Sequence, residues 1–505
     1  MLPIALLVVP LLTALTCRLL YRRPRAMETV NAFGALSMMA LALAVAVDVA
    51  RTGPREALSG LLYVDALSAV MLGTIGVIGA AAALVSIRYL RHDLAIHHVP
   101  DGRRGAGWYY LGLHGFIWTM LFTVSVDNLG LLWVGIEATT LASALLVGFY
   151  RTGAALEAAW KYVILCTVGI TFALFGVLLT YFAAVETAAA GAASLDWTRL
   201  SLEAGQLDPA IMKLAFVFIL VGFGAKAGFA PLHTWLADAH SLAPSPISGL
   251  LSGVLLSCAL YGILRFHMLT TVATGTDFSG NLLLGFGLLS IAVATPFILV
   301  QRDVKRLLAY SSIEHIGLIA VAFGIGGPLG VYAGTLHLVN HAATKALLFF
   351  VTGDIVQRFG TRRISAIRGV LRASPLAGWL LLLGVFAITG VPPSGVFISE
   401  LSIASAGLMG NRLQAVVAVA VVLLLGVIFA GMVAHALRIA YGARGPSDAH
   451  ASGPSGPRFD LPWLAAIIPL AALVVVFGLV VPEPISALFE DVAGVLSASG
   501  TVASR

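Results

Sequence analysis

The stretch GFGAKAGFAPLHTWLADAHSLAPSP, from Gly222 to Pro246, decides how the rest of this chain is interpreted. It lies in a strongly apolar sequence, yet it combines one lysine, two histidines and one aspartate with three glycines and three prolines. Irregular backbone at membrane depth is tolerated only where it lines a cavity or is covered by protein. A charged residue at the same place therefore indicates a functional site inside a membrane.

The composition predicts an all-α polytopic membrane protein. Of its 505 residues, 59% are hydrophobic and only 11% are charged, and the mean hydropathy is +0.97. Soluble proteins carry roughly 25% charged residues. The apolar run from Ile4 to Cys17 has no basic segment before it and no cleavage site of small residues after it, so it is predicted as the first membrane helix and not as a signal peptide.

The sequence contains no obvious redox centre of its own. The three cysteines are scattered through apolar segments, and no Cys-x-x-Cys pair occurs, which argues against a zinc site or an iron–sulfur cluster. No G-x-G-x-x-G or Walker lysine follows a predicted strand, so no nucleotide pocket is expected. We therefore expect no metal and no cofactor bound by this chain.

Runs of mostly apolar residues long enough to span a membrane, about 20 residues each, occur fourteen times. The longest polar connections are predicted at 88–106, 186–209, 353–374 and 441–460, and the Ala/Gly/Ser-rich stretch 187–194 is predicted as a loop. The fourteen segments are predicted to begin near Leu2, Glu28, Tyr63, Trp108, Leu129, Ala158, Ile211, Ile247, Leu282, Leu307, Leu329, Pro375, Gln414 and Leu461.

The distribution of Lys and Arg predicts the orientation. The connections that follow odd-numbered segments carry twenty of these residues, and the other side, including segment ends, carries seven. Lys305 is counted with the first set and Arg265 with the second. Because basic connections stay in the cytoplasm, both termini are predicted on the outer side of a bacterial-type cytoplasmic (inner) membrane. The net charge of +6 reflects this asymmetry and requires no nucleic acid as partner.

Glu137 and Lys226 are charged residues in the middle of apolar segments. Glu137 lies in the fifth segment, where the alternative is a protonated glutamate that only joins two helices. Lys226 lies near the middle of the seventh, which is predicted to span 211–240 and to be broken by glycines and Pro231. Burial destabilises the charged form of a lysine and a nearby carboxylate stabilises it, so such a lysine can load and release a proton. Snorkelling to the interface is the alternative for Lys226.

His337, His341 and Lys345 are spaced four residues apart in the eleventh segment, which aligns them on one helix face. Three aligned titratable groups favour a proton relay over packing. Glu314 and His315 lie on the preceding segment, where they are able to pair with the row.

Glu400 ends a second segment interrupted by glycine and proline, TGVPPSGVFISE. The alternative is a carboxylate in a loop outside the bilayer. Broken segments seven and twelve, five segments apart, predict two inverted five-helix repeats. The predicted division is 1–107 for helices 1–3, 108–271 for the first repeat, 282–441 for the second, and 442–505 for a loop and helix 14.

The motifs resemble those of the antiporter-like membrane subunits of respiratory complex I and of the energy-converting [NiFe] hydrogenases, and most of all the F-type subunit of hydrogenase 4. The motifs that carry the resemblance are WVGIEATTLAS (133–143), AAWKYVILCTVGI (158–170), KAGFAPLHTWLADAHSLAPSPISGLLSGVLLSCALYGILR (226–265), RDVKRLLAYSSIEHIG (302–317), HLVNHAATKALLFF (337–350) and TGVPPSGVFISE (389–400). Together they extend over most of residues 108–405.

The resemblance implies proton translocation driven by redox chemistry in partner subunits, which would hold the redox cofactors. It implies that Glu137 and Lys226 form a glutamate–lysine pair and that Glu400 is the last titratable group of the second half-channel. The residues predicted to form the proton pathway are Glu137, Lys226, His233, His240, Glu314, His315, His337, His341, Lys345 and Glu400.

The eighth segment departs from the family pattern. Complex I relatives carry a central lysine where this chain has Ser257, so the link between the half-channels is expected to differ. We expect other membrane subunits, peripheral redox subunits and the lipid bilayer as partners, with H⁺ or Na⁺ as the transported ion. The alternatives are an Mrp-type cation/proton antiporter subunit and the membrane partner of an inorganic-carbon uptake system.

Overall fold

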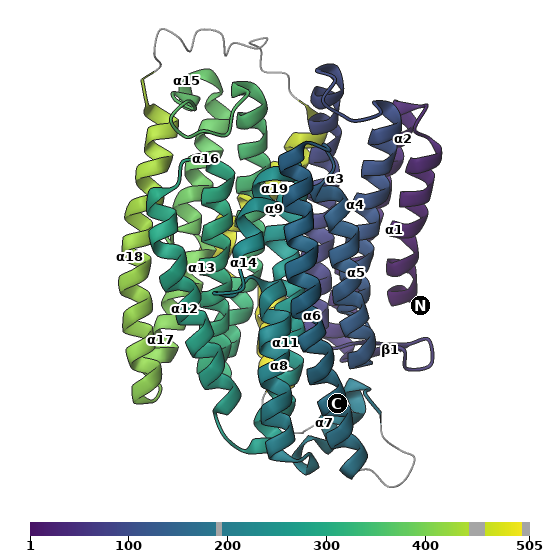
Figure 1. The fold of residues 1–505 in the computed structure, drawn as a ribbon, viewed down its shortest axis with the longest axis vertical. Coiled ribbons are helices and arrows are strands. Elements are labelled where there is room, and N and C mark those ends of the chain that lie inside the picture. Colours follow the sequence, from purple (N-terminus) through teal and green to yellow (C-terminus); the bar gives the residue numbers. More distant parts are fainter. Residues whose placement is uncertain (188–193, 444–459, 497–505) are drawn as a thin grey trace.

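The computed structural model describes residues 1–187, 194–443 and 460–496, and within these ranges helices predominate (Figure 1). Two short antiparallel strands form a hairpin, η1 is a 3-10 helix and η2 is a π-helix. The first elements are α1 (Leu2–Leu19), α2 (Pro24–Thr52), β1 (Arg55–Ala57), β2 (Leu62–Val64), α3 (Ala66–Ala95), α4 (Arg103–Thr123), α5 (Leu129–Val147), α6 (Gly153–Thr187), α7 (Trp197–Glu203), η1 (Ala204–Gln206), α8 (Pro209–Ala227), α9 (Thr234–Leu242), α10 (Ser245–Leu250), η2 (Leu251–Leu255) and α11 (Leu256–Thr274). The remaining elements are α12 (Phe278–Val300), α13 (Val304–Ile325), α14 (Gly327–Phe359), α15 (Val370–Ala373), α16 (Pro375–Ile388), α17 (Gly395–Leu408), α18 (Arg412–Tyr441), α19 (Leu461–Leu479) and α20 (Glu483–Leu496).

The described helices are those of a polytopic membrane protein, which confirms the predicted fold class. Eleven of them are long and apolar enough to cross a membrane, and α16 and α17 are shorter apolar helices. Each predicted segment overlaps either one described helix or a few consecutive helices separated by a break. The total of fourteen crossings and the division into repeats remain predictions from the sequence.

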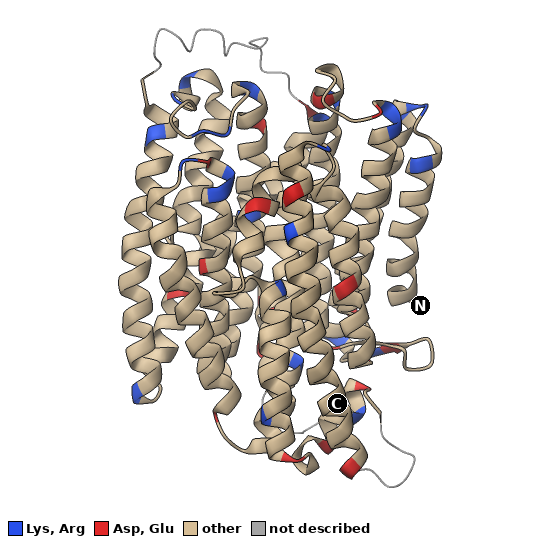
Figure 2. Cartoon of the chain, viewed as in Figure 1, with Lys and Arg blue, Asp and Glu red and all other residues tan. Residues whose placement is uncertain are grey.

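The long helices run side by side along the long axis of the molecule, with α1 and α2 near one edge and α18 at the other (Figure 1). The short helix α15 marks one end of the bundle and α7 marks the opposite end, and these are called the α15 end and the α7 end below. Figure 2 shows much of the Lys and Arg near the α15 end, the end that the sequence predicts to be cytoplasmic.

Helices extend beyond the apolar segments into two of the long predicted connections, most of 88–106 and the first residues of 353–374. Helix α3 continues to Ala95 and α4 starts at Arg103, so only 96–102 connects them. Helix α14 likewise continues to Phe359. A helix satisfies its own backbone hydrogen bonds whether its side chains face lipid or water, so hydropathy alone does not locate its end. The connection 186–209 contains α7 and η1; most of 187–194 and of 441–460 lies outside the described residues.

The predicted break in the seventh segment is confirmed. Helix α8 ends at Ala227, and Gly228 caps it at φ +86°, a left-handed conformation that glycine adopts without a steric penalty. After the connection 228–233, α9 begins, and the indole nitrogen of Trp235 donates to the carbonyl of Ala225 at 2.9 Å. Lys226 therefore lies in the last turn of a half-helix, where the negative end of the helix dipole stabilises a cation.

The predicted break in the twelfth segment is also confirmed. Helix α16 ends at Ile388, Gly390 has a φ of +69°, and α17 begins at Gly395. Ser394 caps α17 by accepting a hydrogen bond from the backbone nitrogen of Phe397 at 3.2 Å. Glu400 lies in the second turn of α17, inside the helix that follows the break.

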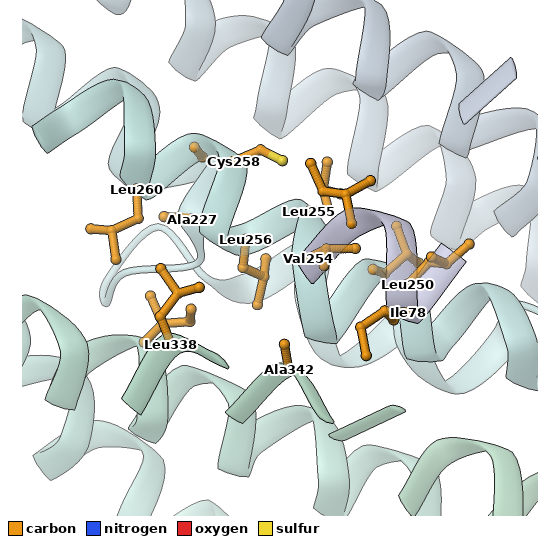
Figure 3. Packing of buried hydrophobic residues seen from close by; sticks show 14 of the residues in the cluster. Ile78, Ala227, Leu250, Val254, Leu255, Leu256, Cys258, Leu260, Leu338 and Ala342 are labelled. Atoms are coloured by element: carbon orange, nitrogen blue, oxygen red, sulfur yellow. The ribbon is translucent and has the colours of Figure 1, made fainter. Parts of the chain in front are cut away.

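A cluster of apolar side chains packs between the two breaks. Figure 3 shows Val254 and Leu256 lying near Ile78 of α3, Ala227 at the end of α8 and Ala342 of α14, and all five belong to one buried hydrophobic cluster. The π-helical turn η2 ends at Leu255, two residues before Ser257 of α11. Turns of this kind are frequent at functional sites.

Candidate functional site

Lys226 is completely buried, with 0% relative exposure, which rules out snorkelling. Its ammonium nitrogen donates hydrogen bonds to Thr140 Oγ1 of α5 at 2.8 Å and to the hydroxyl of Tyr162 of α6 at 2.5 Å. It also lies 4.6 Å from the centre of the Tyr162 ring, within range of a cation–π interaction. The side chain is therefore held by two neutral hydroxyls and an aromatic face.

Glu137 is connected to Lys226 through Thr140. The Thr140 hydroxyl accepts from Lys226 and donates to Glu137 Oε2 at 3.2 Å. The other carboxylate oxygen, Oε1, accepts from Thr167 of α6 at 3.0 Å. A hydroxyl can accept and donate at once, so Thr140 joins the acid and the base while keeping them apart.

Ser143 fixes the hydroxyl of Tyr162. Their oxygens lie 2.7 Å apart, and Ser143 donates to the carbonyl of Thr139 at 2.6 Å. Because the serine proton is used for the backbone, the tyrosine is assigned as the donor between the two hydroxyls. Tyr162 then accepts from Lys226 and donates to Ser143, which extends the hydrogen-bonded chain by two residues.

The predicted pathway residues around α9 and α11 are buried, and each has a polar atom without a partner among the described residues. His233 precedes α9 and has no partner at Nδ1, and Ser257 of α11 has none at Oγ. His240 lies 2.8 Å from the carbonyl of Leu236 through Nδ1 and has no partner at Nε2. Buried polar atoms normally have a protein or water partner, so these three residues are candidate polar positions between the two breaks.

His315 of α13 and His337 of α14 are joined ring to ring. His315 Nδ1 lies 3.0 Å from His337 Nε2, and His337 Nδ1 lies 2.9 Å from Ser399 Oγ of α17. Since Ser399 donates to the carbonyl of Val396 at 2.9 Å, His337 Nδ1 is assigned as the donor to Ser399. The pairing of the eleventh segment with the tenth, predicted from sequence, is therefore present, and α17 extends it.

Glu314 and His341 flank this histidine pair. Glu314 Oε2 lies 3.9 Å from His315 Nε2 and has no hydrogen-bond partner among the described residues. The His341 ring centre lies 5.5 Å from that of His315, and neither of its nitrogens has a described partner. All three side chains are at most 3% exposed, so this cluster of acid and imidazole groups is shielded from solvent.

Lys345 does not bond to the histidines that precede it on α14. Its ammonium group donates to Ser311 Oγ and, at 3.0 Å, to the carbonyl of Leu308, both on α13. It has 0% relative exposure, and its charge acts through space on Glu314. The structure thus brings the tenth and eleventh segments together along five titratable positions and one serine.

Glu400 lies beside the twelfth-segment break. Its Oε2 packs against the α-carbon of Gly390, and its Oε1 is buried without a described partner. Its charge acts through space on that of Glu314. The side chain belongs to α17 and is half-buried, which excludes a loop carboxylate.

Sequence reasoning missed the hydroxyls that join these groups, namely Thr140, Tyr162, Ser311 and Ser399. Thr140 could have been found, because it follows Glu137 by three residues and shares its helix face. Tyr162, Ser311 and Ser399 contribute from other helices, and no spacing within one segment points to them. Within the described ranges, no group of three or more His, Cys, Asp or Glu side chains is placed to hold a metal ion.

Residues 126–426 match the family described as "NADH:quinone oxidoreductase/Mrp antiporter, TM". The chain belongs to this family. It is 44% identical over 372 residues to the hydrogenase-4 component F homolog of Methylacidiphilum infernorum, and the alignment covers 73% of this chain and 78% of that relative. The resemblance inferred from the motifs is thereby confirmed.

Two solved structures share the fold of this family member over almost its whole length. One is a chain of the membrane-bound sulfane sulfur reductase, an archaeal respiratory membrane complex, with a TM-score of 0.83, 25% identity and 98% of both chains covered. The other is a chain of the Mrp complex from Dietzia sp. DQ12-45-1b, with a TM-score of 0.83, 20% identity and 98% of both chains covered. The second similarity concerns the fold alone.

Proposed function

We propose that this chain is the proton-translocating membrane subunit of a multi-subunit, redox-driven complex, such as a membrane-bound hydrogenase or an NADH dehydrogenase-like enzyme. The observation that carries the proposal is the pair of acid–base clusters beside the two helix breaks, in which Lys226 is fully buried and Glu137 half-buried. Glu137, Thr140 and Lys226 form the first cluster. Glu314, His315 and their hydrogen-bonded neighbours form the second.

The proposed route runs from Glu137 and Lys226 toward Glu400. A proton leaves Lys226 when the hydroxyl bridge to Glu137 opens, because the ammonium then loses the carboxylate that favours its charge. Water beside His233, His240 and Ser257 would carry it across the centre, where these residues have unpartnered polar atoms. The second cluster, comprising Glu314, His315, His337, His341 and Lys345, would pass it on to Glu400.

The partners follow from the same proposal. Relatives of this chain bear the names of hydrogenase 4 and NADH-quinone oxidoreductase subunits, so we expect peripheral redox subunits and further membrane subunits here. The redox cofactors would reside in those partners and none in this chain. We expect the complex in a bacterial-type cytoplasmic membrane, with the α15 end in the cytoplasm and both termini outside.

An Mrp-type cation/proton antiporter subunit is the second candidate. Two observations favour it, namely the family description, which includes Mrp antiporters, and the fold shared with the Mrp complex. Such a protein would exchange Na⁺ for H⁺ without an electron donor. A Na⁺ pulse that dissipates a preset pH gradient in the absence of any donor would favour this candidate over the first.

The decisive experiment compares Lys226→Ala with the wild type in inverted vesicles that contain the assembled complex. Proton uptake is followed with a pH-sensitive acridine dye, and the oxidation of hydrogen or NADH is followed in parallel. We expect Lys226→Ala to lower uptake roughly a hundredfold or more, the order expected for loss of a proton-transferring group. Lys161→Ala is the matched control, because Lys161 is exposed on α6 and pairs with Glu157 at 2.6 Å. Unchanged uptake by a stably assembled Lys226→Ala complex would overturn the proposal.

A further inference from the structure

Asp93 and Lys305 are buried ionisable residues at the α15 end, outside the two clusters described above. Asp93 lies in the last turns of α3 and is 2% exposed, and Lys305 lies in the first turn of α13 and is 3% exposed. Neither forms an ion pair within 4.0 Å among the described residues. Because buried charges are normally paired, their isolation calls for an explanation.

Asp93 is held by neutral donors that connect it to the surface. The Tyr150 hydroxyl donates to Asp93 Oδ2 at 2.5 Å, and the Gln357 amide donates to Oδ1 at 2.8 Å. The exposed imidazole of His98 stacks on the Tyr150 ring with centres 4.3 Å apart. His92, on the same helix, and His98 act electrostatically on the carboxylate. A carboxylate beside surface histidines is a suitable collector of protons from water.

Further hydroxyls lead from Asp93 toward the centre of the bundle. The Tyr89 hydroxyl lies 3.2 Å from that of Tyr150. Tyr89 and Ser245 both lie against Gly353 of α14. A Cβ added at Gly353 would lie 2.8 Å from Ser245 Oγ and 3.5 Å from the Tyr89 ring. Ser245 follows Ala243 by two residues, and the carbonyl of Ala243 accepts the hydrogen bond of Lys305 at 2.5 Å.

Lys305 lies between Asp93 and the row of histidines. It interacts electrostatically first with Arg362 and Asp303 and then with Asp93, and its charge also acts on His240. His240 also interacts electrostatically with Lys345 and His341, and its Nε2 has no described partner. Lys305 therefore lies between a carboxylate near the surface and an imidazole near the second cluster.

We propose that Asp93 and Lys305 form the proton entrance at the α15 end. Asp93 takes a proton from water and passes it to the hydroxyls of Tyr150, Tyr89 and Ser245. Bound water between Ser245 and Lys305 would deliver it to the neutral amine of Lys305. Lys305 returns to the neutral form when it gives a proton to His240, so each transfer moves one proton and leaves every group ready for the next. This inference rests on the proposed function, for which it supplies the uptake side.

A neighbouring charged pocket is a less suitable entrance. It has a volume of about 270 Å³ and includes Asp238, Asp303, Arg306 and Arg362 in its lining. Its carboxylates are already neutralised, since Arg306 pairs with Asp238 at 2.8 Å and Arg362 with Asp303 at 3.5 Å. An ion-paired carboxylate binds protons weakly, whereas Tyr150 and Gln357, whose side chains donate hydrogen bonds to Asp93, are neutral.

The test measures proton uptake per electron donor oxidised in inverted vesicles that contain the whole complex. We expect Asp93→Asn and Lys305→Met each to lower uptake about tenfold, and Asp93→Glu to restore at least half of it. Asp354→Asn is the matched control, because Asp354 is a buried carboxylate at the same end that is engaged by Arg88 and Arg358. The Asp93 carboxylate is the group that collects protons in this proposal. The uptake that remains in Asp93→Asn is therefore expected to fall more steeply with rising external pH than the uptake of the wild type.

Lys226→Ala, assayed in the same vesicles, separates the two proposals. One outcome is that Lys226→Ala abolishes uptake while Asp93→Asn and Lys305→Met remain within about twofold of the wild type. A twofold change is too small for a lost proton-transfer group, so this outcome would overturn the proposed entrance and leave the proposed function standing. If all three variants pump normally, both proposals fail. Equal losses in Asp93→Asn and Asp354→Asn, with no change in pH profile, would assign Asp93 a structural role and also overturn the entrance.

Discussion

The carboxylate of Glu400 rests directly against the α-carbon of Gly390. A Cβ added at Gly390 would lie 2.1 Å from Glu400 Oε2, and Gly390 itself adopts a φ of +69°. Gly390, in the break of the twelfth segment, therefore has to be a glycine for two reasons: its backbone conformation and the space that the Glu400 carboxylate occupies. The position of the last group of the proposed route depends on that glycine.

Gly390→Ala should displace Glu400 and reduce proton uptake. A left-handed backbone costs a non-glycine residue roughly 1–2 kcal/mol, and the new methyl group would also push the carboxylate out of its site. Uptake in vesicles and the unfolding temperature of the purified protein measure the two effects. Gly426→Ala is the control, because a Cβ there meets nothing within 4 Å. Wild-type uptake by Gly390→Ala would show that the position of Glu400 is not critical.

Thr140→Val should uncouple Lys226 from Glu137, because it removes the hydroxyl that bonds to both. We expect uptake to fall about tenfold and Thr140→Ser to retain most of it. Thr139→Val is a close control, since the Thr139 hydroxyl donates to the backbone carbonyl of Ile136 at 2.6 Å. Loss in Thr139→Val equal to that in Thr140→Val would argue for a packing effect instead.

Ser399→Ala should leave His337 Nδ1 without its acceptor and so disturb the histidine pair. Loss of one buried hydrogen bond costs about 1–3 kcal/mol, which corresponds to a decrease of about 5- to 150-fold if His337 must be oriented for transfer. Proton uptake per donor oxidised is the measurement. Ser402→Ala, on the same helix, removes a hydroxyl bonded to the carbonyl of Ile398 at 2.8 Å, and it should have little effect on uptake.

Arg265→Met should destabilise the fold, because it leaves Asp65 buried without its cation. The two residues are each 2% exposed and share two hydrogen bonds, of 2.5 and 2.8 Å. Breaking a buried ion pair costs about 3–5 kcal/mol. Denaturation of the purified protein in detergent measures the loss, and the double variant with Asp65→Asn should recover part of it. A double variant less stable than Arg265→Met alone would contradict this account.

Much of the fold was predictable because membrane insertion depends on local composition. Apolar runs must form helices in lipid, where each backbone polar group needs a partner, and this predicts α8 and α16 together with their breaks. Hydropathy did not predict the amphipathic helix α20, whose buried face includes Leu488 and Phe489, because only one side of that helix is apolar.

The candidate site was predictable as a set of titratable residues on individual segments. Glu137, Lys226 and the row from His337 to Lys345 stand out because charged and imidazole groups are rare and costly in apolar helices. The sequence counts assigned Lys305 and Arg265 to polar connections or segment ends, and the structure buries both. Burial of a residue near a helix end depends on which other helices cover it, and no property of its own segment reveals that.

The sequence by itself determined that this chain lies in a membrane and where two of its helices break, and it predicts which titratable groups lie at membrane depth. These properties follow from the free energy of transferring each residue into lipid. Only the tertiary structure decided that Thr140 bridges Glu137 to Lys226, that Ser399 bonds to His337, and that Asp93 and Lys305 share one end of the bundle. Those contacts join residues tens to hundreds of positions apart, and they form only when helix packing brings the side chains within hydrogen-bonding distance.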